Sequence, residues 1–181
     1  MGERETETHV YFWRSESPFS QWHQVGFQDN EGNYYHTAEH YMMVEKARLM
    51  GHWKIVKAML KCKSPRKVKS LGRKVTPWNE NLWLQERENI VTRGNMFKFS
   101  QHPTLQRILL DSNDKILVEA SPYDNIWGIG LAPEDDAVLD EECWDGLNLL
   151  GKCLMRVRET LRRDRVDTNR EGNADEAKDQ S

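Results

Sequence analysis

The sequence predicts a single, mainly helical α+β domain with a small β-sheet. Two helix-start signals, Ser64-Pro65 and His102-Pro103, open stretches rich in helix-forming residues. Short runs of β-branched and aromatic residues lie at His9–Trp13, Tyr34-Tyr35 and Lys115–Ala120. At 181 residues the chain is long enough for one hydrophobic core but short for two. We therefore expect a small sheet built from the N-terminal third plus one later strand, surrounded by helices.

Composition excludes several classes of protein. The formal net charge is −3 and the pI about 6.1, so no overall positive charge indicates a nucleic-acid or membrane partner. No apolar run approaches the length of a membrane span, and the N-terminus is too polar for a signal peptide. The three cysteines, Cys62, Cys143 and Cys153, lack metal-type spacing and indicate free thiols. We expect a soluble, cytoplasmic protein.

The two ends of the chain differ from its middle. Residues 1–8 are polar and are expected to be flexible. Residues 162–181 are charged, with almost no apolar side chains, which predicts a disordered tail. The domain should therefore occupy residues 9–161, closing with a helix over Leu147–Leu161.

The middle of the domain is expected to be a series of helices. Ser64-Pro65 should begin one that stops near Gly72. Thr76-Pro77 repeats this signal and predicts a longer helix from Trp78 to about Arg93, interrupted at Gly94. His102-Pro103 opens another through Leu110, and residues 121–133 should form a loop.

A helix predicted within His36–Arg48 carries the clearest chemical signal. Thr37 can cap its start, and Glu39 then lies in the first turn, where the helix dipole favours a carboxylate. Glu39 and Lys46 are seven residues apart, so they share one face with Met42 and Met43, roughly 10 Å apart along the axis. Either both charges extend past the methionines to solvent, or they form part of a site.

The same stretch contains a zinc-protease pattern. His36-Thr37-Ala38-Glu39-His40 fits H-x-x-E-H. Zinc needs both histidines on one helix face and a third ligand. However, His36 is expected to precede the helix, and so short a pattern arises easily by chance. We therefore predict no metal site.

The loop Asp124–Gly130 is a second candidate site. Trp127 and the adjoining Gly128 offer a stacking face and a backbone that a ligand can approach closely, with Asp124 as a nearby carboxylate. The same residues are also typical of a tight turn with the indole in the core. The pattern alone leaves both interpretations open.

Two further features favour structural roles, although each has a functional alternative. Trp78 and Trp83 are expected in the core, but one of them could line a pocket. A basic cluster is typical of a solvated helical face, but it could attract phosphate or nucleic acid. Its members are Lys61, Lys63, Arg66, Lys67, Lys69, Arg73 and Lys74.

Several short motifs occur along the chain in a particular order and spacing. They are Phe12-Trp13, Pro18-Phe19-Ser20, Thr37-x-Glu39-His40-Tyr41, Lys46-Ala47, Trp83, Met96-Phe97-Lys98-Phe99, Asp124-x-x-Trp127-Gly128-x-Gly130 and Asn148-x-Leu150-Gly151. Taken together, these motifs resemble the NADAR, or YbiA-like, family over residues 9–161. One departure is that Gln21-Trp22 stands where the family commonly has Asn-Phe, which would alter contacts with the sugar.

The resemblance implies hydrolysis of an N-glycosidic bond without a cofactor. Members similar to this chain cleave ribosylamine intermediates of early riboflavin synthesis, giving ribose 5-phosphate and a free aminopyrimidine. Other branches remove ADP-ribose from guanine bases in nucleic acid. A third possibility is a non-catalytic module that binds ADP-ribose or a nucleotide, but the presence of both a carboxylate and an amine in the motifs argues against it.

The chemistry of such a bond leads to a hypothesis for the roles of individual residues. Glu39 is the expected general acid/base, Lys46 acts covalently or electrostatically at the anomeric carbon, and Asp124 holds ribose hydroxyls or activates water. Trp127 is expected to stack on the base, and Arg14 or the basic cluster to meet the phosphate. The other expected substrate-binding residues are Phe19, Ser20, Trp83, Gly128 and Asn148.

Overall fold

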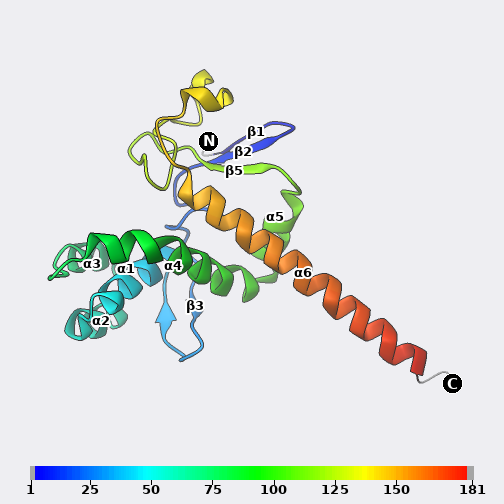
Figure 1. Ribbon diagram of the computed structural model, residues 1–181, viewed down its shortest axis with the longest axis horizontal. Helices are drawn as coiled ribbons and strands as arrows, with labels where there is room; N and C mark the ends of the chain where they lie inside the picture. Colours follow the sequence, from blue (N-terminus) through cyan, green and yellow to red (C-terminus); the bar gives the residue numbers. More distant parts are fainter. Residues whose placement is uncertain (1–2, 179–181) are drawn as a thin grey trace.

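The computed structural model describes residues 3–178, with side chains to residue 166. Helices predominate and two small sheets accompany them, as the sequence predicts (Figure 1). The elements in chain order are β1 (Glu3–Glu5), β2 (His9–Phe12), β3 (Phe27–Gln28), β4 (Tyr34–Tyr35), α1 (Ala38–Leu49), α2 (Trp53–Leu60), α3 (Pro65–Gly72), α4 (Glu80–Ser100), α5 (Pro103–Asp111), β5 (Ile116–Glu119), the 3-10 turns η1 (Asp136–Leu139) and η2 (Glu141–Cys143), and α6 (Leu149–Lys178).

The strands form two sheets rather than the single sheet expected. In the first, β2 lies between β1, to which it is antiparallel, and β5, to which it is parallel. Helices α1 to α5 lie in the connection from β2 to β5, as a parallel crossover requires. The two-residue strands β3 and β4 pair only with each other. The register sets Phe12 opposite Glu119, which is the last residue of β5.

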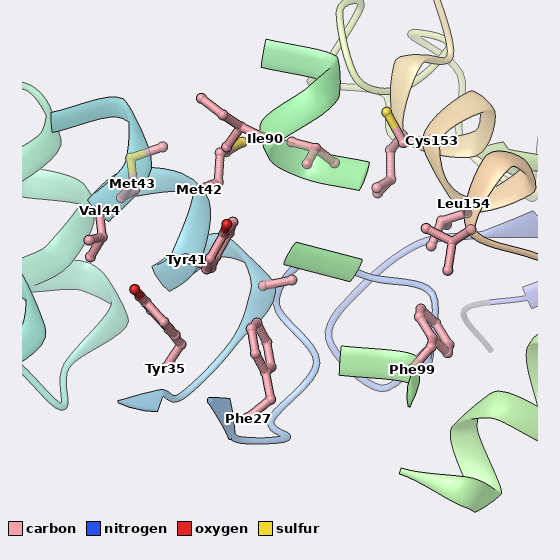
Figure 2. Close-up of a cluster of buried hydrophobic side chains, with 14 of the residues drawn as sticks. Phe27, Tyr35, Tyr41, Met42, Met43, Val44, Ile90, Phe99, Cys153 and Leu154 are labelled. Atoms are coloured by element: carbon pink, nitrogen blue, oxygen red, sulfur yellow. The ribbon is translucent and has the colours of Figure 1, made fainter. Parts of the chain in front are cut away.

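The hydrophobic core lies where α1, α4 and α6 pack together (Figure 2). Tyr41 of α1 lies between α1 and α4, and its ring packs on Gly94. A Cβ at Gly94 would lie 2.5 Å from the Tyr41 ring, so only glycine permits this approach. The interruption expected at Gly94 is therefore wrong: α4 is continuous, and the glycine serves helix packing.

Side-chain caps explain where the helices begin. Thr37 accepts a hydrogen bond from the His40 amide and Ser64 accepts one from Lys67, so both predicted caps are confirmed. The start predicted at Trp78 is wrong, because Asn79 caps α4 and the helix begins at Glu80. The helix α2 was not predicted.

The ends of the chain differ from the expectation of flexibility. Glu3–Glu5 pairs with β2, while residues 1–2 lie outside the described residues. Helix α6 continues past Leu161 to Lys178 instead of giving way to a disordered tail, and residues 179–181 lie outside the described residues. Arg162 supports this continuation, because its guanidinium lies 2.8 Å from both Asp114 and Glu159. Over residues 3–178, no helix has the length and apolar character needed to cross a bilayer.

Candidate functional site

Glu39 is held at the start of α1 by the loop that precedes it. Thr37 caps the helix, and the Glu39 amide donates a hydrogen bond of 2.9 Å to the carbonyl of Gln21. The Gln21 side chain accepts in turn from Asn95 of α4 at 2.9 Å. Glu39 is only 6% exposed. The local fold therefore buries a carboxyl group at the positive end of a helix.

Burial controls the acidity of Glu39. Loss of hydration raises the pKa of this carboxyl to about 7, against the effects of Lys69 and Lys46, which lower it, while Asp124 raises it further. Glu39 and Lys46, the predicted pair, thus interact electrostatically. The charge of Asp124 also acts on Glu39. A carboxyl group that titrates near neutral pH can both donate and accept a proton during turnover.

The Lys46 ammonium lies against two indole rings. Its Nζ is 4.5 Å from the ring centroid of Trp78 and 5.2 Å from that of Trp83. Desolvation lowers the pKa of Lys46, and the carboxylates of Glu39 and Glu80 oppose that effect. Trp83 is buried, as expected of a core residue, whereas Trp78 remains partly exposed. Trp83 therefore lies beside Lys46.

Glu119, which no motif singles out, is a third acid of this site. It ends β5, and burial raises the pKa of its carboxyl to about 8, with Asp124 and Glu39 adding to the rise. Its Oε2 is buried and has no hydrogen-bond partner among the described residues. The one available sequence signal was a carboxylate within an otherwise apolar strand, Ile-Leu-Val-Glu.

The loop after β5 is a tight turn, as one of its two interpretations predicted. Asp124 Oδ1 accepts from the amides of Ile126, at 2.9 Å, and Trp127, at 2.8 Å. A Cβ on Gly128 would lie 2.7 Å from the Glu119 carbonyl, so the missing side chain lets the turn pack on the end of β5. Gly128 therefore positions the loop. Trp127 is partly buried and packs against the core.

The side chain of Asn148 makes two hydrogen bonds to β5, the strand that ends at Glu119. Its backbone has φ +50°, its Oδ1 accepts from the Glu119 amide at 3.1 Å, and its Nδ2 donates to the Leu117 carbonyl at 2.9 Å. Both ends of the amide are thus used to hold β5 beside the start of α6. These contacts position Glu119, and the predicted contact of Asn148 with substrate stays a prediction.

Three other residues predicted to bind substrate make contacts within the protein. Phe19 is buried against Phe12, with the ring centroids 5.4 Å apart. Ser20 Oγ accepts from the Trp22 amide at 3.1 Å. Arg14 is exposed, with its guanidinium carbon 4.9 Å from the Trp13 ring. Packing and loop closure account for all of these contacts.

A lysine of the basic cluster does reach the site. Lys69 of α3 has its Nζ 5.1 Å from the Trp22 ring centroid, and it lowers the pKa of Glu39 more than any other charge. All members of the basic cluster, Lys69 included, are exposed, whereas Trp22 is partly buried. Helix α3 therefore places one of these cations, Lys69, near the Glu39 carboxyl group.

The zinc alternative does not fit the histidines. His40 is buried, its Nδ1 accepts from the His36 amide at 3.2 Å, and its Nε2 lies 2.9 Å from the Met59 carbonyl. Both ring nitrogens are therefore used by the backbone. Among the described residues, no group of three or more His, Cys, Asp and Glu side chains is arranged to hold a metal ion.

A family model relates this sequence to known proteins. The model described as the NADAR domain matches residues 11–162, close to the predicted domain of residues 9–161. This chain belongs to the NADAR domain family. The resemblance seen in the motifs is thereby confirmed.

Relatives of this NADAR protein agree in sequence and in fold. An N-glycosidase of Acanthamoeba polyphaga mimivirus is 42% identical over 165 residues, which cover 86% of this chain and 97% of that protein. A chloroplastic riboflavin biosynthesis protein of Zea mays is 30% identical over 148 residues, covering 77% of this chain but 22% of that protein. The NMR structure of the E. coli protein YbiA is 25% identical, covers 92% of each chain and has a TM-score of 0.73.

The site of this NADAR domain therefore has two kinds of group. Three carboxyl groups, Glu39, Glu119 and Asp124, are close enough to affect one another's ionisation. Two amines, Lys46 of α1 and Lys69 of α3, both lower the pKa of Glu39. Such a set can protonate a leaving group, form or stabilise a bond at a carbonyl-like carbon and neutralise a phosphate.

Proposed function

We propose that this NADAR domain hydrolyses the C–N bond between a ribose phosphate and an exocyclic amine. The observation that carries the proposal is the pairing of buried Glu39, with a pKa near 7, and Lys46, whose pKa is lowered by desolvation. An amine leaves only when its nitrogen is protonated, and the anomeric carbon must be stabilised while it leaves. The N-glycosidase of mimivirus, which shares this family, supports the assignment.

In the proposed reaction Lys46 is the nucleophile. A ribosylamine opens to an imine when its ring C–O bond breaks and the N–H proton of the amine passes to the ring oxygen. Neutral Lys46 then forms a bond to the imine carbon, and one of its N–H protons passes to the former imine nitrogen. That nitrogen takes a second proton from Glu39 and departs as the free amine with the electron pair of its C–N bond, leaving a protonated lysine imine.

Hydrolysis of the lysine imine completes the reaction. Water adds to the imine carbon and gives a proton to Glu39. The hydroxyl proton of the resulting carbinolamine then passes to the lysine nitrogen as the bond between that nitrogen and the sugar carbon breaks. This step releases neutral Lys46 and the aldehyde form of ribose phosphate.

The other charged groups have supporting roles in the proposal. Glu119, whose pKa is about 8, stays largely protonated at neutral pH and can donate a hydrogen bond to a ribose hydroxyl. Asp124 is anchored by its turn and can orient the attacking water. Lys69, next to Trp22, is the cation best placed to meet the phosphate.

The proposed substrates are the ribosylaminopyrimidine phosphates of early riboflavin synthesis. Support comes from the maize relative, whose name is that of a riboflavin biosynthesis protein. A reducing, cytoplasmic location would suit the three free cysteines.

A product assay tests the proposal. Purified protein is given the ribosylaminopyrimidine 5′-phosphate and, separately, an oligonucleotide carrying ADP-ribose on guanine, without added metal. We expect release of ribose 5-phosphate from the first substrate. Release of ADP-ribose from the second alone would transfer the activity to nucleic acid, and no release from either would support a binding module.

One observation favours the nucleic-acid substrate as a second candidate. Residues 46–79, which include α2 and α3, contain eleven Lys and Arg and no Asp or Glu. The remaining 147 residues carry fifteen Lys and Arg and all 29 Asp and Glu. This basic lobe (residues 46–79) adjoins the carboxyl groups through Lys69. A phosphodiester backbone lying along it would bring a modified guanine to the same site.

A further inference from the structure

A pocket next to Lys46 has no role in the proposed reaction so far. It has a volume of about 530 Å³ and lies between the end of α1 and the start of α4. Its walls include Leu49, Met50, Trp78, Asn79, Glu80 and Leu82. The Asn79 amide lies 3.4 Å from Met50 Sδ, which ties the two walls together.

Trp78 links the pocket to Lys46, the amine of the proposed reaction. Leu49 and Met50 follow Lys46 by three and four residues, so they lie on the same face of α1, one turn further along. Trp78 lines the pocket and is also the ring nearest to Lys46 Nζ, at 4.5 Å. At 37% exposure the Trp78 ring retains surface for a ligand. A group attached to the carbon that Lys46 attacks could therefore reach this pocket.

The chemistry of the walls selects an uncharged, planar ligand. Among the described residues that line the pocket, none is Lys or Arg, and its charged member is Glu80. Glu80 Oε2 accepts from Trp78 Nε1 at 2.5 Å, which fixes the indole. A phosphate would be repelled here, whereas an aromatic amine would stack on Trp78, contact Leu49 and Met50, and donate to the carboxylate.

The opposite end of the site has the complementary character. Lys69 and Trp22 lie beside Glu39, seven residues before Lys46 on α1. Lys69 and Trp22 thus lie at the Glu39 end of α1, and Trp78 and Glu80 lie at the end beyond Lys46. A ribose phosphate carrying a neutral heterocycle has the same order of groups.

We propose that this pocket binds the leaving heterocycle and that Trp78 determines which heterocycle is accepted. The inference rests on the proposed N-glycosidase function. It assigns the base to Trp78 and Met50 instead of Trp127, which packs against the core.

The test separates the two ends of the site. Trp78→Ala, Trp78→Phe and the wild type are titrated with a free triaminopyrimidinone and with ribose 5-phosphate, and KM is measured for the intact glycoside. Trp78→Ala should weaken binding of the heterocycle by about tenfold or more, as loss of a stacking partner does, and raise KM similarly. Affinity for ribose 5-phosphate should not change, and Trp78→Phe should retain most of the heterocycle affinity.

Trp53→Ala is the matched control, because Trp53 lies on α2 and is 58% exposed. It should bind both ligands as the wild type does. Unchanged heterocycle affinity in Trp78→Ala, or an equal loss for both ligands, would overturn the inference, as would failure of the wild type to bind the heterocycle. Because these are binding measurements, they remain decisive if no glycoside is cleaved, a result that would count against the proposed function alone.

Discussion

The chemistry of Glu39 follows from its position more than from its residue type. An exposed glutamate is ionised at neutral pH and cannot donate a proton, but burial at the start of α1 keeps this one poised near pH 7. Lys46 is affected in the opposite sense, since desolvation favours its neutral, nucleophilic form. In the proposed reaction, the same apolar surroundings thus prepare Glu39 as the acid and Lys46 as the nucleophile.

Glu39→Gln should lower kcat by roughly 10² to 10⁴, the usual contribution of a general acid. In the wild type, kcat/KM should fall as the pH rises through about 7, because Glu39 loses its proton there. Kinetics from pH 5 to 9 check both effects. A variant with near-normal turnover and the same pH profile would exclude Glu39 as the acid.

The same substitution should alter the pH dependence of folding. The folded-state pKa of Glu39 is raised, so the folded state binds its proton more tightly than the unfolded state between about pH 4.5 and 7. Stability therefore falls as the pH rises across this window, and the ionised carboxylate costs roughly 3 kcal/mol above it. Urea denaturation at pH 5 and pH 8 should show a smaller loss for Glu39→Gln than for the wild type. An equal loss would contradict the buried position.

Lys46 should form a reducible imine with substrate. Borohydride added during turnover should join the sugar covalently to the wild type, and peptide mass analysis should find it on Lys46. Lys46→Arg keeps the cation but cannot form the imine, so it should give no adduct and almost no turnover. Lys152→Ala, at an exposed position of α6, is the control and should label normally. An active Lys46→Arg would mean that the lysine acts only electrostatically.

At the scale of elements, hydrogen bonds between distant segments hold the acids in place. Gln21 accepts from the Glu39 amide, and the α4 side chains Asn95 and Lys98 hold the segment that contains it. Lys98 is fully buried and donates to the carbonyls of Pro18, at 2.6 Å, and Ser20, at 2.9 Å. Asn148 holds β5 in place through its hydrogen bonds to the Glu119 amide and the Leu117 carbonyl. The site therefore depends on helices that contribute no reacting group to it.

Asn148→Ala tests this dependence. It removes both hydrogen bonds to β5 and places alanine at φ +50°, so we expect a loss of about 2–4 kcal/mol in unfolding free energy. Turnover of the protein that remains folded should also fall, because Glu119 is released. Asn113→Ala is the matched control, since Asn113 has φ +48° but is exposed, and its side chain bonds only to the nearby Asp111 carbonyl. Equal losses from the two variants would assign the cost to the backbone alone.

Across the whole molecule, charge is divided unevenly. The basic lobe (residues 46–79) carries no acidic residue, although the chain as a whole has a net charge of −3. In Figure 1 helices α2 and α3 lie together at one side of the molecule, away from the sheet formed by β1, β2 and β5. The positive potential of the basic lobe should attract anionic ligands to this side of the molecule, and added salt should weaken that attraction.

Charge reversal in this lobe should separate the two candidate substrates. Replacing Arg66, Lys67 and Arg73 by Glu should lower affinity for a single-stranded oligonucleotide by at least tenfold at low salt and reduce the salt dependence of binding. KM for the ribosylaminopyrimidine phosphate should stay within twofold, because Lys69 is retained. Undiminished oligonucleotide binding would show that the lobe does not contact nucleic acid.

The sequence by itself determined the local features of this protein. The caps of α1 and α3, the shared face of Glu39 and Lys46, and the family motifs all depend on spacings of a few residues, which helix geometry translates directly into position. These were enough to predict the fold class and the central pair of the site.

Only the tertiary structure decided which other residues join that pair. Glu119 lies eighty positions from Glu39, and Lys69 lies on a separate helix, so no local periodicity relates them. It also showed that Phe19, Ser20 and Asn148 make contacts with neighbouring segments of the protein. Proximity and burial arise when distant segments pack together, and they set the pKa values on which this chemistry depends.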